Sequence, residues 1–276
     1  RNNSVAFTLQ NGDTIDIDTT GEVSDFLTHI GANNNLQLTN QLITVDSSVG
    51  LSAANAKTIA ADTSGTVTAT IATSARVADL TQLRQPDGAT NEVNAFTIVI
   101  STDDATIGNA AHLNTIDAST SVAINAGNVE TITSSSLADI NTLYASSGFS
   151  GLGDQDITAS DDGSIAASTI SAIATANSDG TLDVSGAATI TGTAGQIIAA
   201  FEDSTITEAS DVALTVDSSG TASLTQARTL DGLTTGVVTA TIAATDLSDL
   251  VGSSPLLDAN ENNAFTITIG TDDASV

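Results

Sequence analysis

The sequence contains no cysteine, no methionine and no tryptophan, and its single tyrosine is Tyr144. Without cysteine the chain can form no disulfide, no thiolate metal site and no cysteine nucleophile. Aromatic residues make up only 3% of the chain, so the core must be built from Val, Ile, Leu and Ala. A thin core of small aliphatic side chains suits stacked repeats better than a thick globular interior.

Positive charge is also scarce, because 5 Lys and Arg residues face 33 Asp and Glu residues, which gives a net charge of -28. Such a chain repels nucleic acid and anionic lipid, and it attracts cations. No apolar run approaches the roughly 20 residues that cross a bilayer. We therefore expect no nucleic-acid partner and no membrane insertion of this segment, with cations and further copies or repeats of the chain as partners.

Internal repetition is the most informative feature of the sequence. Segments recur at an offset of 171 residues, or 169 after a short loop difference. The matching pairs are Ile43–Ser48 with Leu214–Ser219, Val67–Ala72 with Val238–Ala243, and Asn94–Ile98 with Asn263–Ile267. Repetition of this kind indicates a stack of similar structural units rather than a set of independent domains.

A shorter period of about 57 residues divides each long repeat into three modules. Two kinds of short helical segment alternate within a module, and a strand-like run rich in Val, Ile and Thr follows each of them. The predicted modules cover residues 1–65, 66–121, 122–180, 181–236 and 237–276, the last of them incomplete. We expect residues 1–276 to form one continuous array that continues into further repeats or further copies.

These patterns predict a repeat solenoid, in which parallel β-strands alternate with short helices or turns. This β/α solenoid, similar to a β-helix, would have about 28 residues per rung, or half-module. Phe96 and Phe265 should occupy equivalent buried positions. The strand-like runs include Leu42–Asp46, Thr66–Thr73, Ala95–Thr102, Val122–Thr133, Asp156–Ser160, Thr181–Thr191, Val212–Asp217, Val237–Ala244 and Ala264–Gly270.

Several phrases resemble the repeat units of very large cell-surface proteins of marine cyanobacteria and related aquatic bacteria. These phrases are Leu113–Asp117, Thr131–Thr133, Ala138–Gly148 and Gly192–Ala194. The resemblance covers nearly the whole chain. It implies an extracellular structural role without an enzymatic site.

Acidic turns follow the strands that come after the second kind of helical segment. Their residues are Asp46, Asp103, Asp104, Asp161, Asp162, Asp217, Asp272 and Asp273. Carboxylate oxygens are the ligands that calcium prefers, so these turns are candidate calcium sites. The alternative interpretation is that Asp, Ser and Thr form the turn and cap the next helix. In the second kind of segment, Asp25, Asp79, Asp139 and Asp249 are expected in the first helical turn, where the helix dipole favours negative charge.

No catalytic group is predicted. His29 and His112 belong to different kinds of segment, and no nucleophile elbow accompanies them. A solenoid enzyme acting on polysaccharide would need aromatic or basic residues that the chain does not provide. The sequence therefore indicates a structural protein of a cell-surface layer, filament or sheath. The alternative is an adhesin or a phage-fibre shaft whose binding tip lies elsewhere in the full chain.

Overall fold

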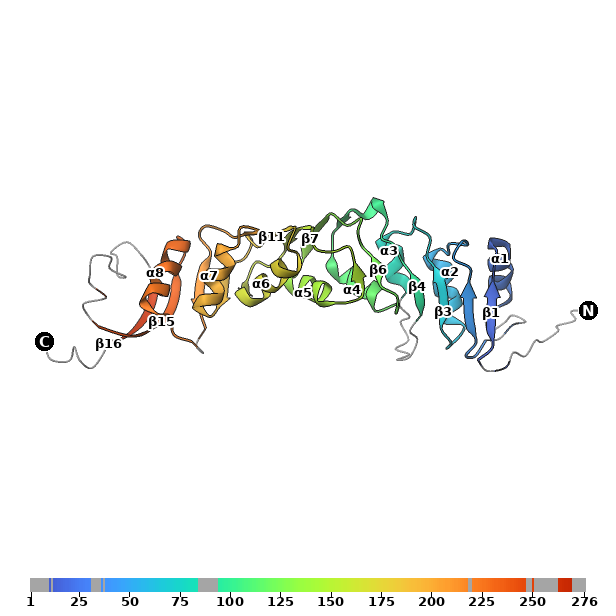
Figure 1. Ribbon diagram of the computed structural model, residues 1–276, viewed down its shortest axis with the longest axis horizontal. Coiled ribbons are helices and arrows are strands. Elements are labelled where there is room, and N and C mark those ends of the chain that lie inside the picture. Colours follow the sequence, from blue (N-terminus) through green and yellow to red (C-terminus); the bar gives the residue numbers. More distant parts are fainter. Residues whose placement is uncertain are drawn as a thin grey trace, which may run out of the picture. The chain divides into compact units, whose positions relative to one another are not determined.

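The computed structural model has an α/β fold with several parallel sheets and short helices (Figure 1). It describes residues 10, 12–30, 36, 38–83, 94–217, 220–246, 250 and 263–269. The chain divides into two compact units, one formed by residues 1–131 and 145–152 and the other by residues 132–144 and 153–276. The described strands close no barrel, and no described helix is both long and apolar enough to span a bilayer.

The first unit contains a four-stranded parallel sheet, in the order β1 (Thr14–Ile17), β2 (Leu42–Val45), β3 (Val67–Thr70) and β4 (Ala95–Thr97). Strand β5 spans Thr106–Ile107, and β6 (Ile124–Asn125) pairs in parallel with β8 (Phe149–Ser150). Its helical segments are α1 (Thr20–His29), α2 (Ala53–Ala61), α3 (Val77–Leu80), η1 (Thr81–Leu83), η2 (Thr102–Asp104) and α4 (Ala110–Asp117). Each of α1 to α4 contacts the next helix along the chain.

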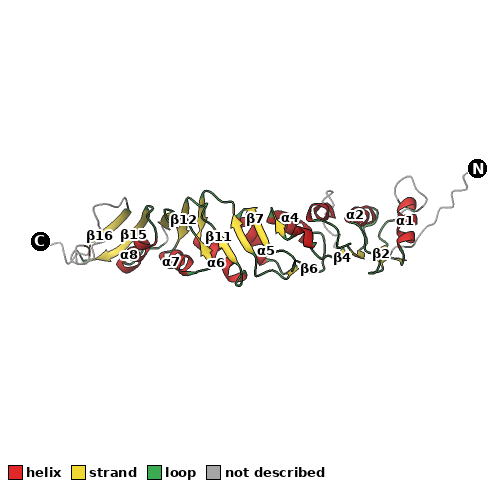
Figure 2. Ribbon diagram, turned by 90° about the horizontal axis from the view of Figure 1, so that it is seen from above, coloured by secondary structure: helices red, strands yellow, loops and turns green. Residues whose placement is uncertain are grey.

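The second unit contains a five-stranded parallel sheet, in the order β10 (Ser164–Ala166), β12 (Thr189–Gly192), β14 (Ala213–Val216), β15 (Val238–Thr245) and β16 (Ala264–Ile269). Another sheet runs in the order β13 (Ile206–Thr207), β11 (Thr181–Asp183), β9 (Asp156–Ala159) and β7 (Thr131–Ser135). The helices are α5 (Leu137–Ala145), α6 (Ala167–Ala176), α7 (Ala194–Glu202) and α8 (Leu224–Leu233). Helix α7 lies between α6 and α8, and Figure 2 shows these helices beside the strands.

Each strand turns its aliphatic residues inward, because successive side chains of a strand point to opposite faces. Ile43 and Val45 of β2 are buried, whereas Thr44 between them is exposed. The helices bury a similar stripe, such as Ala110, Leu113 and Ile116 of α4, at the spacing of one helical face. The core is therefore aliphatic, as the composition predicts.

The structure reproduces the predicted periods. The helices α2, α4, α6 and α8 begin at residues 53, 110, 167 and 224, so each begins 57 residues after the previous one. The strand pairing also repeats at the long offset. Ile43 pairs with Val67 as Leu214 pairs with Val238, and Ala69 pairs with Phe96 as Ala240 pairs with Phe265.

Some expectations are corrected in detail. The runs Val122–Thr133 and Thr181–Thr191 each form two strands instead of one, because a turn interrupts them. In the first turn, Asn125 Oδ1 accepts a hydrogen bond from the backbone N–H of Gly127 over 3.0 Å. In the second, Asp183 Oδ1 accepts one from Ser185 over 2.9 Å. Such local bonds compete with strand continuation.

Two residue-level expectations also change. Phe96 and Phe265 hold equivalent positions in the register, but Phe96 is fully buried and Phe265 is partly exposed. Among the described strands, β16 is the edge of its sheet, so no further described strand covers Phe265. Asp79 and Asp139 lie in the first turn of α3 and α5 as expected. Asp25 lies in the middle of α1, whose first turn instead carries Glu22, and Asp249 lies outside the described residues.

Candidate functional site

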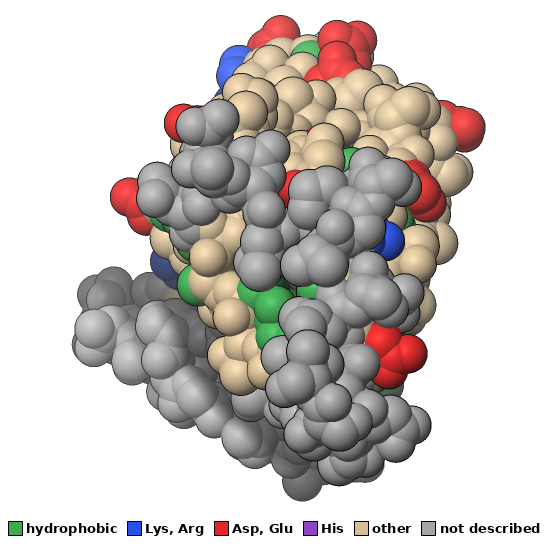
Figure 3. Space-filling model, turned by 90° about the vertical axis from the view of Figure 1, so that its left-hand side faces the viewer, with side chains coloured by type: hydrophobic (Ala, Val, Ile, Leu, Met, Phe, Trp, Pro, Cys, Tyr) green, Lys and Arg blue, Asp and Glu red, His purple; other side chains and the backbone are tan. Residues whose placement is uncertain are grey.

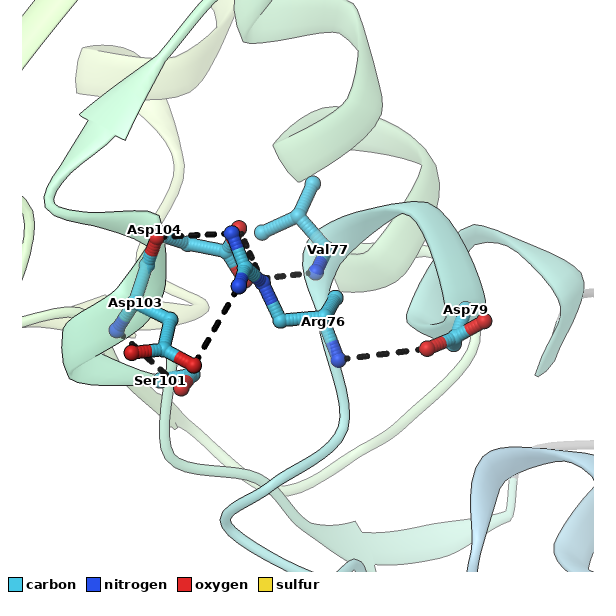
Figure 4. A network of polar contacts seen from close by, with 6 residues as sticks. All are labelled: Arg76, Val77, Asp79, Ser101, Asp103 and Asp104. Atoms are coloured by element: carbon cyan, nitrogen blue, oxygen red, sulfur yellow. Dashed lines mark hydrogen bonds and ion pairs between the residues drawn. The ribbon is translucent and has the colours of Figure 1, made fainter.

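The acidic turns were the best sequence candidates for chemistry, and the most elaborate of them surrounds Arg76 (Figure 4). The guanidinium Nε of Arg76 lies 2.9 Å from Asp104 Oδ1, and its Nη1 lies 3.2 Å from Asp103 Oδ2. Its Nη2 also donates to the backbone oxygen of Asp103 over 2.7 Å. The turn itself is fixed by Ser101, whose Oγ accepts the N–H of Asp103 over 3.2 Å.

Asp104 has a second role in the same cluster, because it caps a helix. Its Oδ2 accepts the backbone N–H of Val77, the first residue of α3, over 2.8 Å. The side chain of Asp104 is only 12% exposed, compared with 71% for Asp103. The hydrogen bond to Asp104 is the main cause that raises the pKa of Arg76. Both oxygens of this half-sequestered carboxylate are thus engaged by protein donors.

Asp161 repeats the capping contact at the next helix of the same kind. Its Oδ2 accepts the backbone N–H of Leu137, the first residue of α5, over 2.7 Å. Ser136 stands at the position equivalent to Arg76, and its Oγ lies 2.7 Å from Asp139 Oδ2. The cross-connection by a carboxylate is therefore shared between the two turns, whereas the guanidinium belongs to one of them.

The remaining acidic residues have different surroundings. Asp46 Oδ1 accepts hydrogen bonds from the hydroxyl and the N–H of Ser48, over 2.5 and 2.8 Å, and these bonds lower the pKa of Asp46. Asp162 is exposed, and the backbone N–H of Asp217 donates to the oxygen of Gly192. Asp272 and Asp273 lie outside the described residues.

These placements bear on the two interpretations of the turns. Asp46, Asp104 and Asp161 act as turn or cap residues, as the alternative interpretation holds. Within the described part of the chain, no group of three or more His, Asp or Glu side chains is arranged to hold a metal ion. Calcium binding by the acidic turns remains a prediction.

Sequence reasoning missed a set of buried polar corners between neighbouring strands. Thr63 Oγ1 donates to the backbone oxygen of Gln41 over 2.8 Å and accepts the N–H of Gly65 over 3.0 Å. Thr234 makes the same two bonds, to the oxygen of Val212 over 2.7 Å and from Gly236 over 2.9 Å. The shared pattern of Thr, a second hydroxyl residue and Gly was the signal available in the sequence.

A related corner in the second unit encloses the single tyrosine. The Tyr144 hydroxyl lies 2.9 Å from Gln155 Oε1 and 3.0 Å from Asn177 Oδ1. Asn177 also accepts the N–H of Gln155 and donates to its oxygen, and both residues are buried. Burial raises the pKa of Tyr144. A hydroxyl held in this way is suited to packing the corner rather than to proton transfer near neutral pH.

The two histidines do not form a joint site. His29 is exposed at the end of α1, where its Nδ1 lies 2.6 Å from the backbone oxygen of Asp25. His112 is exposed on α4. A surface hollow of about 310 Å³ lies between α2 and α3, with Ser52, Ser74, Asp79 and Gln82 among small alanines. It combines one carboxylate with hydroxyl and amide groups and contains no aromatic side chain.

No protein-family model, curated protein or solved structure matches this chain.

Proposed function

We propose that this chain is a stretch of an extracellular structural repeat protein, a β/α solenoid that forms a cell-surface layer, filament or sheath. In this proposal the chain is not an enzyme. The working object is a long anionic array of rungs, and the described units are parts of it. The resemblance of its repeat phrases to very large cell-surface proteins of aquatic bacteria supports the extracellular location.

The observation that carries the proposal is the repetition of individual contacts at the predicted offset. The backbone N–H of Val67 donates to Asn94 Oδ1 over 3.0 Å, and that of Val238 donates to Asn263 Oδ1 over 2.8 Å. The caps of α2 and α8 also repeat, because Ser52 accepts from Asn55 and Ser223 accepts from Gln226, each over 3.2 Å. Selection for a repeated unit, rather than for one site, accounts for such equivalence.

The order of strands supports a solenoid in particular. In the sheet of β1 to β4, and again from β10 to β16, the sheet order follows the chain order and every printed pairing is parallel. Each rung therefore contacts mainly the rungs before and after it, which is the arrangement of repeat arrays. Two such arrays joined in one phase would give the continuous rod that we propose.

The chemistry of the polar residues supports a structural role. The least exposed carboxylate of the Arg76 cluster, that of Asp104, caps a helix and binds the guanidinium, and the buried amides of Gln155 and Asn177 bind each other. These groups stabilise corners between rungs. Figure 3 shows that carboxylates outnumber Lys and Arg side chains on the face that it presents, as expected for a soluble anionic surface.

The proposal is tested by electron microscopy of the native material and of the isolated chain. Gold-labelled antibodies against residues 94–217 should decorate a layer, sheath or filament on intact, unpermeabilised cells. The isolated chain should appear as a rod in negative stain. Labelling only inside permeabilised cells, or compact round particles, would contradict the proposal, and labelling confined to virions would favour the fibre-shaft alternative.

A further inference from the structure

Charge is distributed unequally between the two sheets of the second unit. None of the residues in β10, β12, β14, β15 and β16 is charged. The other sheet carries Asp156 on β9 and Asp183 on β11, and the hydroxyl of Thr181 donates to Asp156 over 2.8 Å. In a chain with a net charge of -28, an uncharged five-stranded sheet is a distinct surface.

The outward side of this sheet presents a regular row of small side chains. Parallel pairing aligns Ala166, Thr191, Thr215, Thr239 and Ala264 across all five strands. We call the outward side of this sheet the threonine face. Its neighbouring strands are about 4.8 Å apart, so its methyl and hydroxyl groups form a flat, closely spaced array.

Exposed apolar side chains point to the same kind of surface. Among the described residues, only two large hydrophobic side chains are strongly exposed, Leu42 at 41% and Val237 at 40%. Val237 directly precedes β15, and its oxygen accepts the N–H of Leu214 in β14. Leu42 lies in β2, the strand equivalent to β14 in the long repeat. Both apolar side chains therefore accompany equivalent uncharged strands.

Electrostatics selects the partner that such a face can accept. Two copies of this chain repel each other strongly, because each carries many uncompensated carboxylates. Contact through a charged face would also bury carboxylates without cations, which is costly. Contact through the threonine face avoids both costs and lets two sheets pack about 10 Å apart.

We infer that the threonine face is the lateral interface through which one copy of this chain packs against a second copy. This inference rests on the proposed structural role and adds the surface by which arrays would join side by side. The occupant is the same face of another copy, so each contact is self-complementary. Helices and acidic turns then remain on the surfaces that face solvent.

The absence of cysteine allows a direct test with single-cysteine variants of the full chain. Thr215→Cys places a thiol at the centre of the threonine face. Thr158→Cys places one at an exposed position of β9, in the sheet that carries the aspartates. In about 1 M salt, where the Debye length is about 3 Å, mild oxidation should give disulfide-linked dimers from Thr215→Cys, at least tenfold faster than from Thr158→Cys. Equal rates, or faster linkage from Thr158→Cys, would overturn the inference.

A second pair of variants separates the face from net charge. Thr239→Lys and Thr158→Lys each make the chain less negative by one charge, so general repulsion should weaken equally in both. If the threonine face is the interface, Thr239→Lys should raise the dimer dissociation constant at least tenfold in sedimentation velocity experiments, while Thr158→Lys should not. Equal effects, or a wild-type chain that stays monomeric at every salt concentration, would contradict the inference. Microscopy showing a cell-surface rod would still leave the proposed function standing.

Discussion

Asn94 at the entrance to β4 accepts the backbone N–H of Val67, the first residue of β3, through its side-chain oxygen over 3.0 Å. Asn94 is buried, so its replacement by alanine would leave that N–H without a partner. Asn94→Ala should lower the free energy of unfolding by about 1–3 kcal/mol. Urea denaturation followed by circular dichroism would measure it. The exposed Thr68→Ala should change stability by less than about 0.5 kcal/mol, and equal losses in the two variants would contradict the role of Asn94.

Two glycines near the end of α8 should respond to alanine in opposite directions. A Cβ on Gly236 would lie 2.3 Å from the oxygen of Asp211 and 2.6 Å from that of Val212, whereas a Cβ on Gly232 meets nothing within 4 Å. Gly236→Ala should therefore destabilise the chain by about 1–3 kcal/mol through overpacking. Gly232→Ala, within the helix, should stabilise it by about 0.5–1 kcal/mol. Thermal melts of both variants test this, and a harmless Gly236→Ala would refute the close approach.

Glu208 should make stability depend on pH. Its Oε1 is buried without a hydrogen-bond partner among the described residues, and burial is the main cause that raises its pKa from 4.5 to about 7. Below pH 4.5 the carboxyl is protonated in both states. As pH rises from 4.5 to 7, ionisation is favoured in the unfolded state, so the free energy of unfolding falls, by about 1–3 kcal/mol in all.

Glu208→Gln removes this penalty and isolates it from the general repulsion of the acidic chain. The variant should be more stable than the wild type above pH 7, and the difference should shrink towards pH 4.5. Urea denaturation at several pH values would measure it. Glu202→Gln removes the same charge from an exposed position at the end of α7 and serves as the control. Identical pH profiles for both variants would show that Glu208 is not the responsible group.

The two carboxylates beside Arg76 should differ in their effect on stability. Asp104→Ala removes the cap of α3 and the bond to Arg76 Nε, and it should cost about 1–3 kcal/mol. Asp103 is largely exposed, so Asp103→Ala should cost less than about 1 kcal/mol. Denaturation at low and high salt would compare them. An Asp103→Ala variant that is as unstable as Asp104→Ala would argue against the capping role.

The calcium prediction for the acidic turns has its own measurement. A cation that binds only the folded chain stabilises it by mass action. Calcium should then raise the melting temperature more than magnesium does at the same ionic strength, and Asp103→Asn and Asp162→Asn should reduce the difference. Melts that are unchanged by calcium and by chelator would leave these turns with only their capping role.

Much of the architecture could be read from the sequence because it depends on periodicity. The echo of Ile43–Ser48 in Leu214–Ser219 predicted strands that pair in the same register, and the 57-residue period predicted the starts of α2, α4, α6 and α8. Alternating Val, Ile and Thr predicted which side chains face inward. These properties follow from local patterns that recur in every rung.

The sequence by itself thus determined the composition of the core, the parallel strands between short helices, and the equivalence of distant segments. The tertiary structure alone decided which partners the polar side chains have. The carboxylate of Asp104 caps a helix that begins 27 residues earlier, and Gly236 is required by a carbonyl of the preceding strand. Such contacts depend on how one rung lies against the next, because hydrogen bonds and close packing act over a few ångströms in space and are blind to separation along the chain.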